Sequence, residues 1–441
     1  MLTDTAKGLS LHSFWPRVRE FAVPPSMVET ATARRHAGDW AGACAAAGFD
    51  VDLSPRSVAR THGHERAAQI RADLRHLAPD LLRWHMPRVA PDGLLRPGLT
   101  LTLARYGDVH LVARTPPAWA DAGQRVSLAL WDGTRSEATA RRHPHPHPDR
   151  RFRLDLHRHL WDARRTDELR SRSGADRPCA DGPPPAHAVD RWAAEARLLL
   201  RAEGMPAGPV SVRLGGRNRL LLQPAPDGEG YREAPRTAGP GDPPPPVLPY
   251  AATWRLPDLM LLRAGALPAH RLHPLVASAL VPDLPARDPL RSPEPYGGPH
   301  LVECRGALHR IALVDGVLAP LDHDPDELRR EELLVALTGT PLPCLRAIDV
   351  AHRRPDCLTG VRERLDHGDV AGALAVVEGL LGPDAVLRDG VLRDELEAAA
   401  RRRLTHGLYR AGLAEPGAGQ ARPAPGRPRD HRRRLRHGTH R

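Results

Sequence analysis

The stretch from His62 to Arg88 reads HGHERAAQIRADLRHLAPDLLRWHMPR and carries the strongest periodic signal in the chain. Its large apolar residues recur at the spacing of one helix face: Ile70, Leu74, Leu77 and Leu81. This pattern predicts an amphipathic helix whose apolar side faces a core. Because a proline removes one backbone donor and crowds the preceding turn, Pro79 predicts a kink or two abutting helices.

The length and composition fit a folded protein, since 441 residues correspond to two or three domains of about 150 residues each. Hydrophobic residues make up 41% of the chain, which is enough for a buried core, but aromatic residues make up only 4%. The core must therefore be built mainly from Leu, Val and Ala. The 47 prolines and 38 glycines are clustered, which indicates linkers rather than a collagen-like repeat.

The positive charge is concentrated near the end of the sequence. The formal net charge is +11, and 63 of the 64 basic residues are arginine because Lys7 is the only lysine. Residues 415–441 contain eight arginines and two acidic residues, a net charge of +6, which leaves +5 for the other 414 residues. An arginine bias together with abundant Ala, Gly and Pro is typical of a GC-rich genome, so net charge alone is weak support for phosphate binding.

The cysteines are odd in number and widely separated: Cys44, Cys179, Cys304, Cys344 and Cys357. None forms a C-x-x-C pair, which predicts a reducing compartment and thiols buried as small apolar residues. The first 25 residues lack the apolar segment of a signal peptide, and no run of about 18 apolar residues predicts a membrane-spanning helix. We therefore expect a cytoplasmic protein with no membrane partner.

The sequence predicts an α+β fold, with a helical N-terminal region, an antiparallel β-rich middle and a helical C-terminal region followed by a disordered basic tail. The expected regions, in order, are a weakly structured N-terminal segment (1–25), a helical region (26–90), an antiparallel β meander plus helix (91–172), a linker (173–187), a helix and β-hairpin (188–223), a Pro/Gly-rich linker (224–247), an α+β region ending in helical hairpins (248–413) and the tail (414–441).

The meander is predicted by four segments in which apolar and polar residues alternate. They are centred on Leu101, Leu111, Leu128 and Leu154. A period of two places alternate side chains on opposite faces of a strand, so these segments indicate an antiparallel sheet with one apolar face.

A short motif occurs near both ends of the chain, as AGDWAGACA at 37–45 and HGDVAGALA at 367–375. The glycine suits a helix C-terminus, the following aspartate can cap the next helix, and small residues allow close approach. Each copy therefore predicts an αα-hairpin similar to those of tetratricopeptide repeats. A solenoid needs at least about three adjacent repeats, so convergent hairpin chemistry is the preferred explanation for two distant copies.

Two groups of histidines are candidates for metal ligands. The first comprises His62, His64, Glu65, His76 and His85. It lacks an H-E-x-x-H pattern and is interrupted by a proline, so its side chains need not share a face. The second group alternates with prolines: His143, His145 and His147. A loop gives no rigid frame for converging ligands, and the preferred interpretation of both groups is structural.

Asp322, His323 and Asp324 are arranged in sequence like an acid–base trio. Adjacent residues in an extended segment point apart, and Asp324 precedes Pro325 and Glu327 in the pattern of a helix N-terminus. We therefore expect Asp324 to be an N-cap. The sequence contains no G-x-S-x-G elbow, and no Walker loop is possible without a second lysine.

Four stretches carry a resemblance to a known group of proteins: ETATARRHAGDWAGACAAA, DLRHLAPDLLRWHMPR, HPLVASALVPD and VECRGALHRIALVDG. In these stretches the chain resembles large uncharacterised proteins of GC-rich actinobacteria such as the streptomycetes. The resemblance implies no activity. Such proteins are also similar to accessory partners of MoxR-type AAA+ ATPases in multi-gene systems, which implies an AAA+ ATPase as the protein partner.

These observations lead to three alternative functions. The first is a non-catalytic cytoplasmic adaptor or regulatory protein that acts through protein–protein contacts, without catalytic residues or a cofactor. The second is association with nucleic acid through arginines of the tail that neutralise phosphates: Arg427, Arg429, Arg432, Arg433, Arg434 and Arg436. The third is a metal-dependent enzyme that uses His62, His64 and His85.

Overall fold

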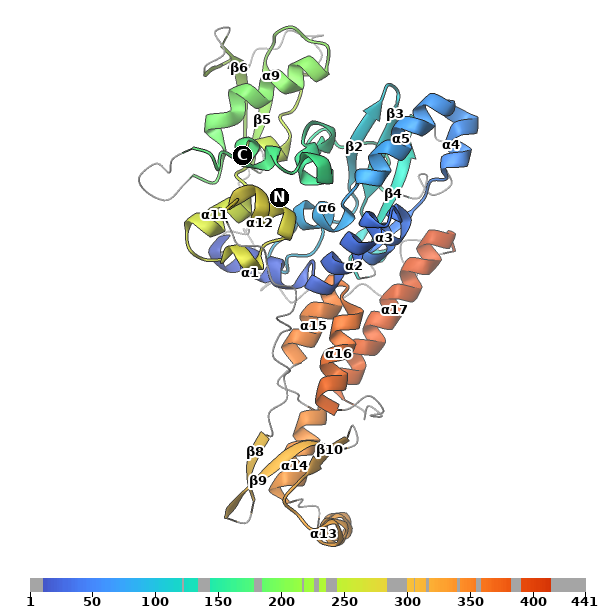
Figure 1. Ribbon diagram of the computed structural model, residues 1–441, viewed down its shortest axis with the longest axis vertical. Helices are drawn as coiled ribbons and strands as arrows, with labels where there is room; N and C mark the ends of the chain where they lie inside the picture. Colours follow the sequence, from blue (N-terminus) through green and yellow to red (C-terminus); the bar gives the residue numbers. More distant parts are fainter. Residues whose placement is uncertain are drawn as a thin grey trace, which may run out of the picture.

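The computed structural model describes residues 11–120, 123–133, 143–177, 185–215, 218–225, 230–234, 244–283, 300–304, 306–314, 317–338, 342–353, 358–381 and 390–413. It confirms the predicted α+β class, with one four-stranded and two three-stranded sheets. Figure 1 shows two parts. Residues 11–283 form the larger part, the body, and residues 300–413 project from it as an arm.

The body begins with six helices and one short strand: α1 (Leu11–Phe21), α2 (Pro25–His36), α3 (Trp40–Ala46), β1 (Phe49–Val51), α4 (Pro55–His62), α5 (His64–His76) and α6 (Pro79–His85). The proline prediction is confirmed, because α5 ends just before Pro79 and α6 begins there. The four apolar residues that define the periodic face are at most 1% exposed. The expected weak structure over 1–25 is wrong for residues 11–21, because Phe14, Trp15 and Val18 form one buried face of α1.

The main sheet has the order β1-β4-β3-β2, with β2 (Thr100–Tyr106), β3 (Val109–Arg114) and β4 (Val126–Trp131) antiparallel. Strand β1 joins β4 in parallel, with Phe49 paired to Val126. The fourth expected strand does not form. Residues 154–156 are instead a 3₁₀ turn, η2 (Leu154–Leu156), in which Leu154 O accepts a hydrogen bond from Trp161 Nε1 at 3.0 Å.

A second sheet, β5-β6-β7, packs with a helix at the top of the body in Figure 1. Its elements are η5 (Val189–Arg191), α9 (Trp192–Ala202), β5 (Val210–Gly215), β6 (Asn218–Pro224) and β7 (Tyr231–Glu233). Short helices connect these layers: η1 (Ala118–Ala120), η3 (Arg158–Leu160), η4 (Ala163–Arg165), α8 (Glu168–Ser173), α10 (Tyr250–Thr253), α11 (Pro257–Arg263), η6 (Ala269–Arg271) and α12 (Pro274–Leu280). The last four pack in the body, because Leu261 and Val276 belong to the core that begins at Phe14.

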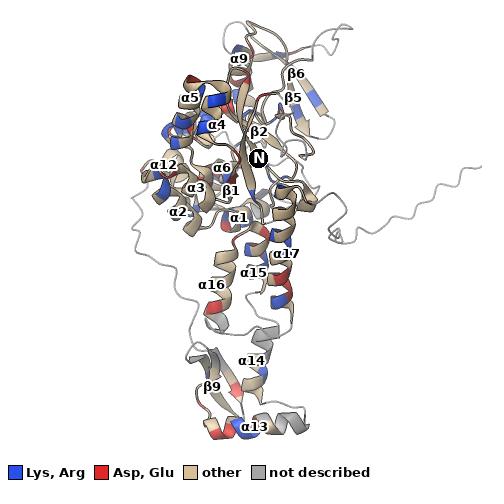
Figure 2. Ribbon diagram, turned by 90° about the vertical axis from the view of Figure 1, so that its right-hand side faces the viewer, with Lys and Arg blue, Asp and Glu red and all other residues tan. Residues whose placement is uncertain are grey.

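The arm has two parts. The distal module contains β8 (His300–Cys304), β9 (Ala307–Val314), β10 (Val317–Pro320), α13 (Pro325–Thr338) and α14 (Pro343–Arg353). The stalk contains α15 (Leu358–His367), α16 (Val370–Leu381) and α17 (Val391–Ala411). Figure 2 shows the stalk between the body and the distal module, with charges of both signs along α17.

The two copies of the repeated motif form two matching hairpins, which confirms the αα-hairpin prediction. Between α2 and α3, Asp39 Oδ1 accepts a hydrogen bond from Gly42 N at 2.8 Å, and Arg34 donates to Oδ2 at 3.2 Å. Between α15 and α16, Asp369 accepts from Gly372 N at 2.9 Å and from Arg364 at 3.1 Å. Both glycines lie so close to the capping carboxylate that a Cβ there would overlap it.

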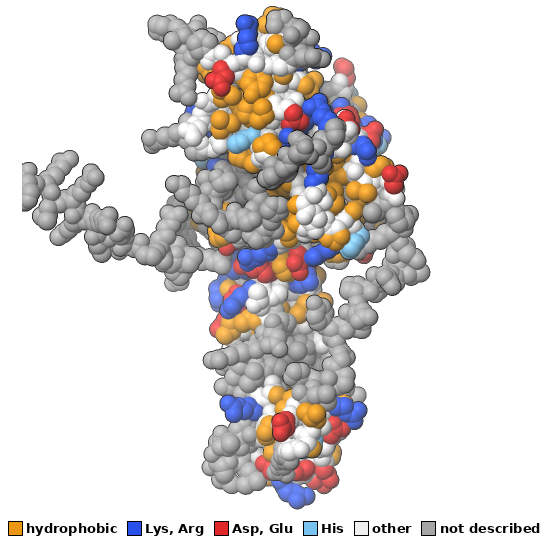
Figure 3. Space-filling model, turned by 90° about the vertical axis from the view of Figure 1, so that its left-hand side faces the viewer, with side chains coloured by type: hydrophobic (Ala, Val, Ile, Leu, Met, Phe, Trp, Pro, Cys, Tyr) orange, Lys and Arg blue, Asp and Glu red, His pale blue; other side chains and the backbone are white. Residues whose placement is uncertain are grey.

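The stalk docks on the body through the α15–α16 turn and the end of α17. Arg83 donates to His367 O at 2.8 Å, and Gly368 lies against the backbone of Gly123. At the second contact, Arg410 is bound by both carboxylate oxygens of Asp52, at 2.6 and 2.5 Å. Charged side chains of both signs gather where the arm leaves the body (Figure 3). In the part of the chain that is described, no helix is both long and apolar enough to cross a bilayer.

Candidate functional site

The arginines proposed from the sequence for nucleic-acid binding, residues 427–436, lie outside the described residues. The first histidine group does not converge on one point. His62 lies 3.7 Å from Asp132, whereas His85 is buried and lies 3.2 Å from Leu160 O. The one group of three or more potential metal ligands found within the described residues includes none of these histidines.

Of the three histidines between prolines, His145 and His147 are exposed, as expected for a surface loop, whereas His143 is buried. His143 is 5% exposed, its Nε2 lies 2.8 Å from Thr115 O, and burial lowers its pKa. The adjoining backbone covers β2, because Thr100 donates to His145 O at 2.7 Å and its own carbonyl accepts from Asp149 N at 2.9 Å. This segment therefore closes one side of the main sheet.

A buried cluster joins α1, α6 and α11. Arg19 donates two hydrogen bonds of 2.8 Å to the carboxylate of Asp258 and one of 2.6 Å to Trp84 O. The guanidinium also lies 4.3 Å from the Trp84 ring centroid. Beside it, burial is the main cause that lowers the pKa of His85 to about 3. Every charge in this cluster has a partner, which is the pattern of a structural ion pair.

His273 and Asp80 form a pair with the geometry of a catalytic dyad, at 2.9 Å between Nε2 and Oδ2. Their side chains are each only 1% exposed. His273 also caps α12 by accepting a hydrogen bond from Leu275 N. A general base must reach its substrate, and burial in the core prevents that here.

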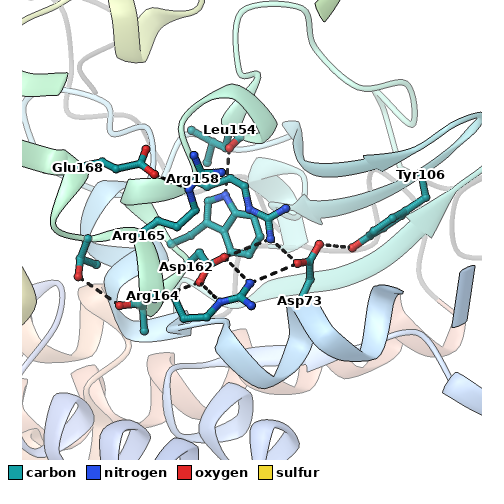
Figure 4. A network of polar contacts seen from close by, with 11 residues as sticks. Asp73, Tyr106, Leu154, Arg158, Asp162, Arg164, Arg165 and Glu168 are labelled. Carbon is teal, nitrogen blue, oxygen red and sulfur yellow. Dashed lines mark hydrogen bonds and ion pairs between the residues drawn. The ribbon is translucent and has the colours of Figure 1, made fainter. Parts of the chain in front are cut away.

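A third polar network connects α5 to β2 and the 3₁₀ turns (Figure 4). Asp73 accepts a hydrogen bond from the Tyr106 hydroxyl at 2.7 Å and is paired with Arg158. Asp162 accepts from Arg158 and Arg164 at 3.1 and 3.0 Å. Burial alone would raise the pKa of Asp162, but the hydrogen bonds from Arg164 outweigh it and the pKa is lowered. Carboxylates that are paired with arginines in this way hold elements together rather than transfer protons.

A cleft with a volume of about 740 Å³ lies between the second sheet and the segment before η2. Four arginines line it: Arg150, Arg151, Arg213 and Arg219. Asp149 binds Arg151 there through several hydrogen bonds, among them one of 2.9 Å from the Arg151 backbone. The lining favours an anionic molecule over a neutral one.

The distal module brings together residues that the sequence did not link: Cys304, His323 and Cys344. One ligand atom from each lies within 4.8 Å of the other two. Cys304 ends β8, Cys344 lies in the first turn of α14, and both are fully buried. Burial, followed by a hydrogen bond with Cys304, raises the pKa of Cys344 to about 11. Both cysteines are thiols rather than a disulfide.

The neighbours of His323 are engaged in structural contacts and do not form an acid–base trio with it. Asp322 binds Arg310 at 2.7 Å, and these hydrogen bonds lower the pKa of Asp322 to about 2. Asp324 accepts a hydrogen bond from Asp326 N at 2.8 Å just before α13, as predicted for an N-cap. Local sequence patterns do not reveal the cysteine–histidine cluster, because its members are 19 and 21 residues apart and lie in β8, in the turn between β10 and α13, and in α14.

Comparisons with protein-family models, with curated proteins and with solved structures found no match. The function is therefore argued from this chain's own residues. Two features bear on it: the arm with its exposed apolar side chains, and the cysteine–histidine cluster at the end of that arm.

Proposed function

We propose that the protein is a cytoplasmic, non-catalytic adaptor that presents the distal module to a protein partner. The observation that carries this proposal is the distribution of exposed large apolar side chains. Among the described residues these are Val189 on the body and, on the arm, Leu308, Leu321, Leu333, Leu374, Leu404, Leu408 and Leu413.

Two leucines of the distal module are strongly exposed to solvent. Leu308 on β9 is 68% exposed and Leu333 on α13 is 66% exposed, whereas Val189 is 38% exposed. Apolar side chains dispersed over a surface are common, but here seven of the eight described ones lie on the arm, and three of these are on the distal module, which projects farthest from the body (Figure 1). A partner that covered them would gain apolar burial without rearranging the body.

The position of the arm also supports a role in recognition. One end is fixed to the body by the buried guanidinium of Arg83 and the close contact of Gly368 with Gly123. The other end is held away from the body by the stalk helices α15, α16 and α17 (Figure 2). An AAA+ ATPase of the MoxR type is the partner that the resemblance implies, and it is the first candidate to test.

The test is a pull-down from a nuclease-treated lysate of the native host with the full chain as bait. We expect a stoichiometric protein partner that Leu308→Glu and Leu333→Glu lose and Val189→Glu retains, since Val189 is the matched exposed residue on the body. Retention by all three variants would overturn the role of the distal module. Recovery of nucleic acid alone, dependent on residues 415–441, would replace the adaptor proposal with the nucleic-acid alternative.

A further inference from the structure

We propose that Cys304, His323 and Cys344 form a zinc site, with the two cysteines binding as thiolates. This inference does not depend on the adaptor proposal, because a structural metal can stabilise the distal module whatever the arm binds. Zn²⁺ prefers sulfur and imidazole ligands, and sets of two cysteines with histidine are among its common protein sites. Two thiolates also neutralise its charge in a buried position.

The spacing of the ligand atoms fits such a site. In a tetrahedron with Zn–S distances of about 2.3 Å and Zn–N distances of about 2.0–2.1 Å, ligand atoms are roughly 3.5 Å apart. The three atoms here lie within 4.8 Å of one another. Small side-chain movements would bring them to bonding distance, with no change in the strand pairing that positions Cys304 opposite Ala307.

His323 has a buried side chain with an unpaired ring nitrogen. Its side chain is 3% exposed, and its Nε2 is a buried atom without a hydrogen-bond partner. A buried polar atom without a partner is destabilising, and a metal bound to this nitrogen would remove that penalty. The other nitrogen, Nδ1, lies 3.6 Å from the carboxylate of Glu327. Metal-binding histidines commonly have a carboxylate on the second nitrogen, which orients the ring.

We take His309 as the candidate for the fourth coordination position. Its ring stacks on His323 with 4.2 Å between centroids and 13° between planes, and its buried Nδ1 has no hydrogen-bond partner. The β8–β9 register pairs Val302 with His309 and Cys304 with Ala307. Residues two apart on a strand share a face, so His309 and Cys304 both face α14. Beside the ligands, the apolar cluster of Ile311 and Leu342 limits access of water.

Zn²⁺ bonds to the two sulfurs and to one nitrogen of His323, and the two thiol protons pass to solvent. Because the metal displaces two thiol protons, zinc affinity increases as pH rises.

The first experiment measures bound metal in the reduced, full-length protein. We expect about one zinc per chain and, after exchange for Co²⁺, the intense visible bands and sulfur charge-transfer absorption of a tetrahedral thiolate site. Cys304→Ser, Cys344→Ser and His323→Gln should each weaken binding at least about tenfold. Cys44→Ser is the matched control, since Cys44 is also a buried thiol but lies in the body, and it should retain one zinc.

A second measurement on the wild-type chain avoids variants that fail to fold. Zinc should protect Cys304 and Cys344 from alkylation at least about tenfold, while the labelling of Cys44 stays unchanged. Three results would overturn the inference: no zinc or cobalt bound by the reduced protein, zinc bound equally by the three ligand variants, or the same alkylation of Cys304 and Cys344 with and without zinc. The second result would indicate binding to other histidines of the chain.

Discussion

In the body, apolar residues from α1 to α12 form a large core, whereas the apolar residues of the arm form two small clusters around Val361 and Ile311. The exposed large apolar side chains follow the opposite distribution, with Val189 on the body and the remaining seven described ones on the arm. Free energy from burial scales with the apolar area removed from water. The body is thus stabilised by its own core, and the arm depends on its attachments.

Ion pairs in the two parts also differ in how deeply they are buried. In the body, Arg19 and Asp258 are paired in the interior, while the ion pair of Arg310 and Asp322 in the distal module is exposed to solvent. Exposed pairs contribute little to stability, and breaking a buried pair costs much more. The difference predicts that equal chemical changes have unequal effects in the two parts, and that the arm can detach without unfolding the body.

The largest effect is expected for Asp258→Ala. This change leaves the guanidinium of Arg19, which is 5% exposed, without its carboxylate. We expect a loss of about 3–5 kcal/mol in the free energy of unfolding, measured by urea titration with tryptophan fluorescence. Asp190→Ala is the control, because Asp190 pairs with Arg255 nearer the surface and should cost less than about 1 kcal/mol. Equal losses would show that burial of the pair does not matter.

The next largest effect is expected for Gly368→Ala at the docking turn. Gly368 has φ = +87°, and a Cβ there would overlap the carbonyl of Gly123. Strain and displacement should weaken docking of the arm by about 2–3 kcal/mol. Hydrogen exchange should increase in the stalk while the melting of the body stays unchanged. Gly360→Ala in α15 has open space around its Cβ and should leave docking intact; similar exchange in both variants would contradict a detachable arm.

Much of this arrangement could be predicted where the signal is local. The periodicity around Ile70 and Leu74 was sufficient for α5, Pro79 for its end, and the glycine–aspartate pair for both hairpins. Helix α1 was missed because only Phe14, Trp15 and Val18 mark its buried face and Pro16 lies within it.

Long-range arrangement could not be predicted from the same patterns. Strand β1 has three residues and pairs in parallel with β4, whose register begins at Val126. No local pattern links these segments. The candidate metal ligands pose the same problem, because Cys304, His323 and Cys344 meet only after β8, β10 and α14 have packed. Metal motifs are recognisable in sequence when their ligands share one turn or hairpin, and these do not.

Docking of the stalk on the body should also depend on pH, through His367. Burial, followed by the charges of Arg88, Arg83 and Arg17, lowers the pKa of His367 to about 3. Above pH 6.5 the histidine is neutral in both docked and released forms, so docking keeps its full strength. As pH falls from 6.5 towards 3, only the released form takes up the proton, and docking weakens. The loss is about 2 kcal/mol at pH 5, since each pH unit corresponds to about 1.4 kcal/mol.

The measurement is hydrogen exchange in the stalk at pH 7.5 and pH 5, corrected for the intrinsic exchange rate. His367→Gln cannot take up a proton, so the pH dependence of docking should become shallower. His270→Gln, on the surface of the body, should match the wild type. Glu363 lies 4.0 Å from His367, so Glu363→Gln tests its share. Equal slopes in the wild type and His367→Gln would remove this histidine as the cause.

The smallest effect is expected at the helix N-caps of the two matching hairpins. Asp39→Ala and Asp369→Ala each remove a helix N-cap, for which we expect a loss of about 1 kcal/mol. The side chain of Asp39 is 41% exposed and that of Asp369 is 7% exposed. Because water replaces the lost hydrogen bonds more readily at the exposed site, Asp369→Ala should cost more. Asp39→Ala should lower the free energy of unfolding of the body, whereas Asp369→Ala should increase exchange only in the stalk. The same response in both regions would mean that body and arm unfold as one unit.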